Sequence, residues 1–515
     1  MSLTQEAQPD AGTQTTASHD AKARDLKGAD IENDSQADSK KRASADTSAS
    51  QGLRATLDLL RAANRKQGAP SYDKRIEHLD ALRRVLVTNK EAIAKAISAD
   101  FGGRSRTESL VAEVFVTVTG IEYAKERLHE WMEIEPREVA WTFMPGRAEV
   151  HNQPLGVVGV IAPWNYPVQL VFAPLVAALA AGNRVMVKPS ELVPETSALI
   201  AKMIGEAFAK DHVTCHPGGV EVSEEFSKLP LDHLVFTGST RIGKVVMKAA
   251  AENLVPVTLE LGGKSPAIVG RDFSIATAAE RIMSGKLFNS GQTCIAPDYA
   301  LVPRKEVDAF VSECKSAVAR MYPTLVGNAD YTSIVNDRQK QRLEGYLVDA
   351  KENGARIVPL NAGNESFEKT RKMQPTLVLD AKESMAVLGE EIFGPILPIL
   401  PYDTLDEAIA YVNDHPRPLA LYVFDHDDEA VEKVLRETTS GGVTVNDTML
   451  HIAQDDMPFG GVGPSGMGHY HGREGFDTFT KKKPVFYQSR LNATDLMRPP
   501  YGKAVDYFLK FVLGK

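Results

Sequence analysis

A regular alternation of short β-branched segments with amphipathic segments, beginning near residue 157, most limits the folds open to this chain. Strand-like segments followed by helix-like segments predict a parallel sheet whose strands are joined by helical crossovers. A doubly wound nucleotide-binding domain is the expected result. The predicted strands are Val157 to Ile161, Val185 to Val187, Leu234 to Thr237 and Val257 to Leu259, and the helices are Leu170 to Ala181, Thr196 to Phe208 and Ile242 to Asn253.

A second alternation begins after Ser265 and predicts another α/β domain. Its strands lie near Ala267 to Val269, Ala300 to Val302 and Thr376 to Val378, and its helices include Val307 to Met321 and Gln339 to Asn353. Upstream, apolar residues recur at helical spacing from Leu53 onward, whereas residues 1 to about 50 almost lack large apolar side chains. We therefore expect a disordered tail, a helical region and two α/β domains, as a length of 515 residues allows.

Charge and cysteine content limit the function classes. The formal net charge of −9 argues against nucleic acid as a partner and favours small molecules. Only Cys215, Cys294 and Cys314 occur, without the spacing of a disulfide framework or a zinc site, so a reducing cytoplasm and no bound metal are expected. The N-terminus lacks an export signal, and the longest apolar run, Leu170 to Ala181, is too short to span a membrane.

Cys294 is the candidate nucleophile. The segment from Ile275 to Phe288 predicts a helix, and Asn289, Ser290 and Gly291 are residues that end one. Cys294 therefore follows in a loop, closed by Pro297, where backbone N–H groups can lie beside its sulfur. For an isolated cysteine, the alternative is a buried structural thiol.

Two further segments offer groups for carbonyl chemistry. Asn165 lies in a stiff turn between Pro163 and Pro167, where its amide can stabilise an oxyanion or only bond its own backbone. Glu260 ends an apolar strand before two glycines, and burial would raise its pKa as a general base requires. A salt-bridged structural glutamate is the alternative for Glu260.

Three segments suit a dinucleotide. Lys188 and Glu191 follow a strand and can bind a ribose diol, or are simply two solvated charges. A turn between a strand and a helix offers N–H groups to a phosphate, although it is not a GxGxxG fingerprint. Glu391 and Phe393 precede Gly394 and Pro395, where the carboxylate can hold a second ribose and the ring can pack on a flat ligand. The phosphate-binding turn contains Gly238, Ser239, Thr240 and Gly243.

The C-terminal region predicts two strands and a helix. Phe476 to Phe479 and Val485 to Tyr487 are strand-like, with Lys481 to Lys483 between them, which suits an exposed edge or one completed by a partner subunit. Ala504 to Leu513 is an amphipathic helix that can dock on the protein or, less favoured, make weak contact with a membrane surface.

Taken together, these motifs resemble the aldehyde dehydrogenase superfamily from about residue 55 to 490. The shared motifs are PWN, KPSE, FTGSTxxG, ELGGKSP, GQTC, EEIFGP and PFGGVGPSGMG. The segments HIAQDD and RPPYGK further resemble the coniferyl-aldehyde dehydrogenase group, related to the class 3 and fatty-aldehyde enzymes.

The resemblance implies a Rossmann-type NAD-binding domain, an α/β catalytic domain and a small β oligomerisation arm. It implies a tail at 1–50, an NAD-binding domain at 51–261 with 132–153 contributing to the arm, a catalytic domain at 262–460, a return segment and oligomerisation strand at 461–490, and a C-terminal tail or helix at 491–515. A homodimer is expected.

The resemblance also implies roles for the candidate residues. Cys294 attacks the aldehyde, Asn165 and the Cys294 N–H hold the oxyanion, and Glu260 activates water to hydrolyse the thioester. Glu391 positions the nicotinamide ribose and Phe393 packs beside the nicotinamide. Lys188 and Glu191 hold the adenosine ribose, and Trp164 and Ser239 lie near the pyrophosphate with the turn from Gly238 to Gly243.

The expected function is NAD(P)-dependent oxidation of an aldehyde to a carboxylic acid, with coniferyl aldehyde or a related aromatic aldehyde as substrate. NAD is expected over NADP because the Glu191 carboxylate would repel a 2′-phosphate. The alternatives are a fatty-aldehyde dehydrogenase, an acylating enzyme that uses coenzyme A, and an inactive structural or binding homologue. A thiolate beyond a helix C-terminus is disfavoured by the helix dipole, so activation of Cys294 requires the cofactor or Glu260.

Overall fold

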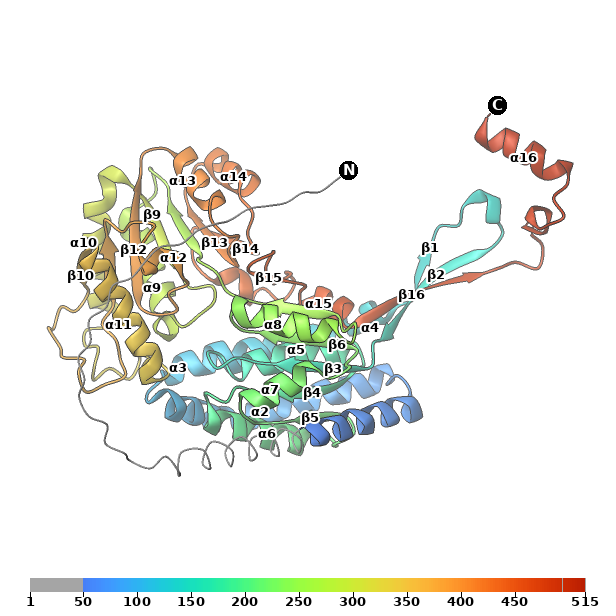
Figure 1. The fold of residues 1–515 in the computed structure, drawn as a ribbon, viewed down its shortest axis with the longest axis horizontal. Coiled ribbons are helices and arrows are strands. Elements are labelled where there is room, and N and C mark those ends of the chain that lie inside the picture. Colours follow the sequence, from blue (N-terminus) through green and yellow to red (C-terminus); the bar gives the residue numbers. More distant parts are fainter. Residues whose placement is uncertain (1–49, 493, 515) are drawn as a thin grey trace, which may run out of the picture. The chain divides into compact units, whose positions relative to one another are not determined.

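The computed structural model describes residues 50–492 and 494–514, so the predicted tail at 1–50 lies almost entirely outside the described residues (Figure 1). Helical segments precede the first large sheet and continue between its strands. They are residues 50–67, α2 (Tyr72–Phe101), α3 (Arg106–Ser109), the π-helical turn η1 (Leu110–Phe115), α4 (Val116–Met132), α5 (Gln169–Ala180), α6 (Pro194–Ala207), α7 (Val220–Ser227) and α8 (Thr240–Ala251).

A six-stranded sheet has the order β15-β7-β6-β3-β4-β5, with only β15 antiparallel to its neighbour. Alternate side chains of its central strands face opposite helical layers. Val158 and Val160 pack with α2, α4, α5 and α6, whereas Val157 and Ile161 pack with the first helix, α7 and α8. This confirms the doubly wound arrangement. The strands are β3 (Val157–Ile161), β4 (Arg184–Lys188), β5 (Val213–Cys215), β6 (His233–Thr237), β7 (Val257–Glu260) and β15 (Gly466–Met467).

The register of this sheet gathers the candidate residues at one edge. Ile161 pairs with Lys188, and Thr237 pairs with Glu260, at the carboxyl ends of parallel strands. Ligands of open α/β sheets bind at this edge. The turns after β3, β4, β6 and β7 therefore all open toward the same side.

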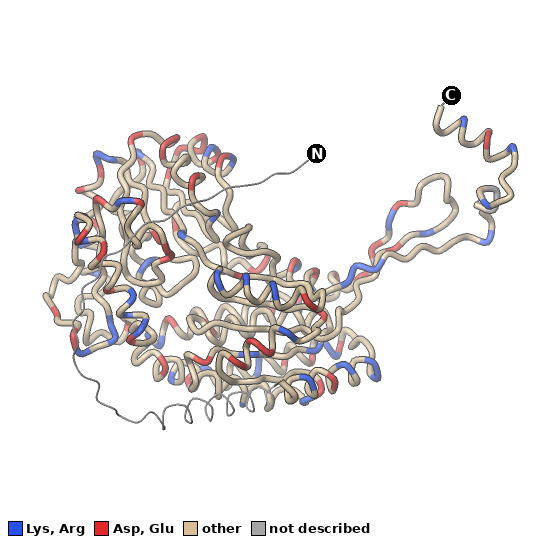
Figure 2. Tube along the Cα trace, in the orientation of Figure 1, with Lys and Arg blue, Asp and Glu red and all other residues tan. Residues whose placement is uncertain are grey.

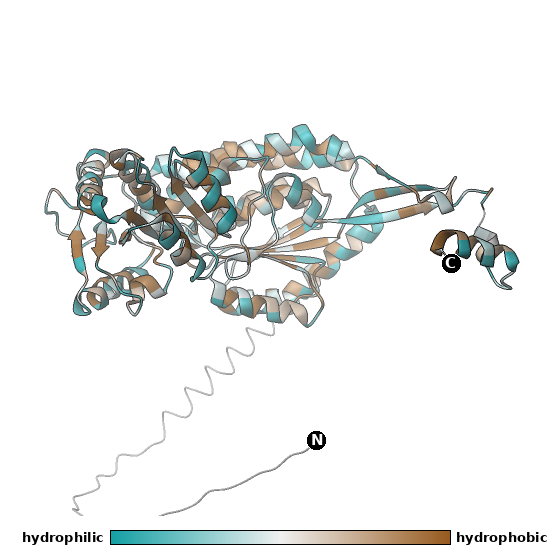
Figure 3. Cartoon of the chain, turned by 90° about the horizontal axis from the view of Figure 1, so that it is seen from above, coloured by the Kyte–Doolittle hydropathy of each residue, from teal (hydrophilic) through white to brown (hydrophobic). Residues whose placement is uncertain are grey.

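The second sheet has seven strands in the order β10-β11-β12-β9-β8-β13-β14, with only β10 antiparallel. One face of this sheet forms a core with α9 and α10, and the other face forms a core with α11, α12, α13 and α14. Figure 3 shows hydrophobic residues concentrated on the strands. The strands are β8 (Pro266–Val269), β9 (Tyr299–Pro303), β10 (Arg356–Pro359), β11 (Thr376–Leu379), β12 (Ile396–Tyr402), β13 (Ala420–Phe424) and β14 (Gly442–Val445). The helices are α9 (Ile275–Leu287), α10 (Val307–Met321), α11 (Asp337–Glu352), α12 (Ala386–Gly389), α13 (Leu405–Asn413) and α14 (Asp428–Glu437).

A third, antiparallel sheet has the order β1-β2-β16. It consists of β1 (Glu135–Arg137), β2 (Arg147–Pro154) and β16 (Thr480–Tyr487). The lysines at 481–483 lie within β16 and are exposed at the sheet edge, so they do not separate two strands as predicted.

The predicted strand at Phe476 to Phe479 is wrong, because these residues form and end helix α15 (Gly472–Thr478). Phe476 and Phe479 are three residues apart, and both rings are fully buried in the core that includes α5. Residues at this spacing share one face of a helix, so packing overrides their β-propensity.

The C-terminal helix α16 (Lys503–Leu513) has no buried residue. Its Phe508 ring lies 6.1 Å from the Trp141 ring, centroid to centroid. Among the described residues, this ring contact is the support for the favoured expectation that α16 docks on the protein. No helix of the described residues is both long and apolar enough to cross a membrane.

Candidate active site

The loop that carries Cys294 begins where α9 ends. Asn289, Ser290 and Gly291 all have positive φ angles, of 51°, 55° and 75°, which turn the backbone out of the helix as their residue types predict. Gln292 then fixes the loop, because its amide donates to the Ser333 carbonyl oxygen at 3.0 Å and its Oε1 accepts from the Val335 N–H at 2.9 Å. The position of Cys294 is therefore set by buried hydrogen bonds.

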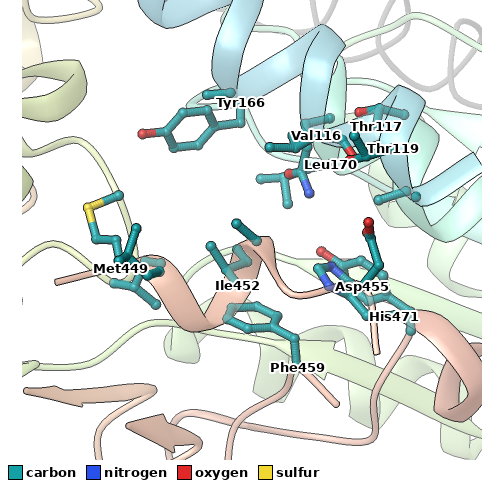
Figure 4. A pocket seen from close by; sticks show the side chains of 18 of the residues that line it. Val116, Thr117, Thr119, Tyr166, Leu170, Met449, Ile452, Asp455, Phe459 and His471 are labelled. Atoms are coloured by element: carbon teal, nitrogen blue, oxygen red, sulfur yellow. The ribbon is translucent and has the colours of Figure 1, made fainter. Parts of the chain in front are cut away.

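Cys294 and Glu260 line one cavity of about 360 Å³. Volumes of this size suit a small organic ligand. Most of the surrounding side chains are apolar, and Figure 4 shows several of them converging on the space. The labelled apolar residues are Val116, Leu170, Met449, Ile452 and Phe459.

The thiol of Cys294 is poorly ionised in this environment. Burial, followed by the carboxyl groups of Glu391 and Glu260, raises its pKa to about 12. The backbone N–H groups of Cys294 and Ile295 act in the opposite sense, as the predicted loop geometry requires. The structure therefore leaves ionisation of the Cys294 thiol dependent on a bound cofactor or on Glu260, as the sequence indicated.

Glu260 ends β7 and is 2% exposed. Neither of its carboxyl oxygens has a hydrogen-bond partner in the part of the chain that the structure describes, and burial raises its pKa well above the ordinary value. The salt-bridged alternative is therefore excluded. An uncompensated buried carboxyl group is costly to maintain and is typical of functional sites.

Asn165 is buried, and both its backbone carbonyl group and its side-chain amide form hydrogen bonds with the loop that carries Cys294. Its carbonyl oxygen accepts from Arg104 Nη1 at 2.9 Å and from Asn289 Nδ2 at 3.1 Å. Its own Nδ2 donates to the Gln292 carbonyl oxygen at 3.2 Å, two residues before Cys294. One N–H of this amide has that partner, and the second can serve a ligand.

The edge expected to hold an adenosine ribose carries a preformed ion pair. Lys188 Nζ lies 2.9 Å from Glu191 Oε2, with 1% and 35% of the two side chains exposed. The lysine is therefore not a solvated charge, while the glutamate retains access to solvent. A cation and a carboxylate together offer a donor and an acceptor to a diol.

The turn formed by Gly238, Ser239 and Thr240 lies at the start of α8, where unpaired N–H groups and the helix dipole favour an anion. A Cβ atom added at Gly243 would lie 2.7 Å from Leu261 Cδ2, so glycine is needed for this helix to pack closely. Thr240 Oγ1 donates to the Pro464 carbonyl oxygen at 3.0 Å. Phosphate contacts at this turn would therefore come mainly from backbone groups, Ser239 and Gly238.

Glu391 and Phe393 lie in a loop tied to the cysteine segment, since the Ile392 N–H donates to Asp298 at 3.1 Å. The Phe393 and Trp164 rings are 5.4 Å apart in an edge-to-face arrangement. Burial raises the pKa of Glu391 to about 8, and its buried Oε1 has no partner. A ribose hydroxyl would supply that partner, so the residues fit a nicotinamide nucleotide.

Comparison with known proteins agrees with this geometry. The model of the "Aldehyde dehydrogenase family" matches residues 25–485. The chain belongs to the aldehyde dehydrogenase family. It is 53% identical over 454 residues to a "probable coniferyl aldehyde dehydrogenase" of Pseudomonas aeruginosa, covering 88% of this chain and 94% of that protein.

Two solved aldehyde dehydrogenases show the same fold. The substrate-bound state of Staphylococcus aureus AldH has a TM-score of 0.84 and 39% identity, covering 89% of this chain and 99% of that one. A Mycobacterium tuberculosis aldehyde dehydrogenase complexed with NAD+ has a TM-score of 0.76 and 29% identity, covering 85% and 90%.

The aldehyde dehydrogenase site also contains residues that sequence reasoning missed. Arg104 and Glu113 form a fully buried ion pair at 2.9 Å, and Glu113 accepts from the Val168 and Gln169 N–H groups at 2.9 and 2.8 Å. This pair connects the helical region to the turn that carries Asn165. The signal in the sequence that could have identified these residues was an isolated charge within an apolar helical segment.

Lys286 is a third residue that the sequence analysis did not identify. It is fully buried on α9, its Nζ has no hydrogen-bond partner, and burial lowers its pKa to about 8. The groups that act against this decrease are Asp298 and Glu391. Lys286 therefore adds positive charge to the same buried region as Glu391.

Proposed function

We propose that this chain oxidises an aromatic aldehyde of the coniferyl type to its carboxylic acid with NAD. The observation that carries the proposal is the meeting of the Cys294 thiol and the unpaired Glu260 carboxyl group in one largely apolar cavity. Similarity to a coniferyl aldehyde dehydrogenase over most of the chain supports the aromatic substrate.

The chain's own residues supply every step except hydride acceptance. The Cys294 thiol loses its proton to solvent water, and its sulfur then bonds to the carbonyl carbon. The carbonyl π bond opens, and the resulting oxyanion is held by Asn165 Nδ2 and the Cys294 N–H. NAD, if bound here, would supply the hydride acceptor for that carbon, and its positively charged ring would oppose the carboxyl groups of Glu391 and Glu260, which raise the thiol pKa. Glu260 then takes a proton from the water that hydrolyses the thioester.

Cofactor binding is assigned to the edge described above. Lys188 and Glu191 hold the adenosine ribose, the turn from Gly238 to Gly243 and Trp164 lie along the pyrophosphate, and Glu391 and Phe393 position the nicotinamide half. The exposed Glu191 carboxylate favours a free 2′-hydroxyl over a 2′-phosphate, so NAD is preferred over NADP.

The test is a substrate panel with the purified chain. Coniferyl aldehyde, benzaldehyde and a long-chain aldehyde are each supplied with NAD or NADP, and reduced cofactor and acid are measured together. We expect one acid per reduced cofactor and the highest kcat/KM with coniferyl aldehyde and NAD. Acid formation that requires coenzyme A, or no turnover of any aldehyde, would contradict the proposal.

A fatty aldehyde is the second candidate substrate, because the cavity wall is mostly apolar. The same panel separates the two classes: a long-chain aldehyde with a kcat/KM above that of both aromatic aldehydes would favour this candidate.

Assembly and location are part of the proposal. The sheet β1-β2-β16 leaves β16 at an edge with exposed lysines and Phe486, which suits an oligomerisation arm of a homodimer. We also propose domain limits at 51–261, 262–460 and 461–490: β3 to β7 lie in the first segment and β8 to β14 in the second, while β15 and β16 of the last segment join the first and third sheets. The three cysteines are free thiols, which supports a reducing compartment such as the cytoplasm. Light scattering measures the assembly.

Helix α16 remains available for weak contact with a membrane surface or with a partner.

A further inference from the structure

The cavity that contains Cys294 has two chemically different ends. Tyr166 marks the thiol end, because its hydroxyl lies 2.5 Å from the hydroxyl of Thr293, the residue before Cys294. Figure 4 shows Tyr166 and Met449 on one side of the cavity and Asp455 and His471 on the other. The second end has no role in the chemistry described above.

Polar groups gather at that second end. The Thr119 hydroxyl lies within hydrogen-bonding reach of both the Val116 carbonyl oxygen, at 3.0 Å, and the Asp455 carboxyl group. His471 Nε2 is buried and has no hydrogen-bond partner within residues 50–492 and 494–514. Because burial lowers the pKa of His471 to about 4, its ring is neutral and can donate or accept a hydrogen bond. An unpaired buried nitrogen beside a ligand cavity indicates a missing partner.

The carboxyl group of Asp455 is held in the cavity by its surroundings. A Cβ atom added at Gly120 of α4 would lie 3.3 Å from Asp455 Oδ1, so the carboxyl group packs closely against the helix at this glycine. The next residue, Asp456, accepts a hydrogen bond from the Tyr123 hydroxyl on the same helix. These two contacts fix the segment to α4 and keep Asp455 facing the cavity while Asp456 faces outward.

We propose that Asp455, with Thr119 and His471, forms a hydrogen-bonding subsite for the ring hydroxyl of a phenolic aldehyde. This inference rests on the proposed function. In a para-hydroxylated aromatic aldehyde, the hydroxyl and the aldehyde lie at opposite ends of a rigid frame, as Asp455 and Cys294 lie at opposite ends of the cavity. The hydroxyl donates to the Asp455 carboxylate, and an adjacent ether oxygen can accept from His471. Specificity for hydroxylated rings follows, since a bare ring would leave these groups unpaired.

The experiment compares two substrates that differ only in this hydroxyl, 4-hydroxycinnamaldehyde and cinnamaldehyde. We expect Asp455→Leu to lower kcat/KM for the hydroxylated aldehyde by about 10- to 100-fold while changing that for cinnamaldehyde less than about threefold. Asp455→Asn retains an acceptor oxygen and should recover part of the loss, mainly through KM. Asp456→Asn is the matched control, because it removes the neighbouring negative charge but keeps an oxygen that can accept from the Tyr123 hydroxyl and so hold the segment in place.

The outcomes separate the subsite from the function on which it rests. Equal losses on both substrates would assign Asp455 a structural role and overturn the subsite, as would no loss on either. A loss from Asp456→Asn that equals that from Asp455→Leu would also overturn it. If the unaltered enzyme oxidises neither aldehyde, the proposed function itself fails and the subsite fails with it.

Discussion

The proposed nucleotide edge, which carries Lys188 and Glu191, and the thiol cavity differ in whether their charged groups are already paired. At the nucleotide edge, Lys188 and Glu191 already form a 2.9 Å ion pair with the glutamate partly in solvent. In and beside the cavity, Glu260 and Lys286 are buried and Glu391 is partly buried, and each has a buried polar atom without a hydrogen-bond partner among the described residues. A binding surface can be completed before its ligand arrives, whereas a reacting centre keeps unsatisfied groups for the substrate and the transition state.

Charge over the rest of the chain resembles the nucleotide edge. Figure 2 shows acidic and basic residues interspersed along the described chain, and several form exposed pairs such as Arg106 with Glu91. Exposed pairs of this kind contribute little to stability. The sharp contrast is therefore local to the cavity, and substitutions there should have larger effects than substitutions at the edge.

Loss of the Cys294 sulfur is expected to have the largest effect. Cys294→Ala should lower kcat with any aldehyde on the order of 10⁴-fold or more, because no thiohemiacetal can form. Initial rates of NADH formation measure this. Cys314→Ala is the control, since it removes a buried thiol of α10 outside the cavity. Comparable rates for Cys294→Ala and the unaltered chain would show that Cys294 is not the nucleophile, and the cavity would no longer differ from the edge as proposed.

Glu260 should come next. Glu260→Gln keeps the shape but cannot take a proton, so kcat should fall by about 10²- to 10³-fold. Hydrolysis would become limiting, and a burst of NADH equal to the enzyme concentration should precede slow turnover. Stopped-flow absorbance detects the burst. Glu252→Gln, at an exposed position after α8, is the matched control. Slow turnover without a burst would instead assign Glu260 to an earlier step.

The sequence predicted the strands and turns that carry the site residues better than it predicted how those residues are packed and buried. Strand β3 was predicted with both of its observed ends, and the turn after α9 was predicted from Asn289, Ser290 and Gly291. These features depend on local backbone preferences, which are present in the sequence. The error at α15 arose where two phenylalanines are buried against a helix distant in sequence, so tertiary packing decided the outcome.

The network behind Asn165 was beyond sequence reasoning for a related reason. Arg104 and Glu113 are nine residues apart, yet both are fully buried and bond backbone groups more than fifty residues away. Charged residues are normally expected at the surface. Only the packing of η1 against the start of α5 reveals that this pair holds the site together.

The pH dependence of Cys294 reactivity should be an effect of intermediate size. It tests whether burial is what sets the thiol cavity apart from the edge with Lys188 and Glu191. Since burial raises its pKa to about 12, the thiolate fraction should rise about tenfold per pH unit from pH 7 to 10 without a plateau. Iodoacetamide labelling followed by mass spectrometry measures the rate at Cys294. Adding NAD at pH 8 should accelerate labelling if the positive ring lowers the pKa. A plateau near pH 8 in the free chain would show that burial does not control this thiol.

Glu191 should give the smallest effect, because its carboxylate is partly exposed and screened by water. Glu191→Gln keeps a hydrogen-bond acceptor for a ribose hydroxyl but removes the negative charge that opposes a 2′-phosphate. We expect the ratio of kcat/KM for NADP to that for NAD to rise by about two- to fivefold. Glu195→Gln, exposed in the first turn of α6, tests whether any nearby charge has the same effect. Equal shifts in both variants would mean that long-range charge, and not the Lys188–Glu191 pair, sets the preference. A shift near 100-fold would instead show that Glu191 acts with the strength of the buried groups around Cys294, and the contrast between the two regions would disappear.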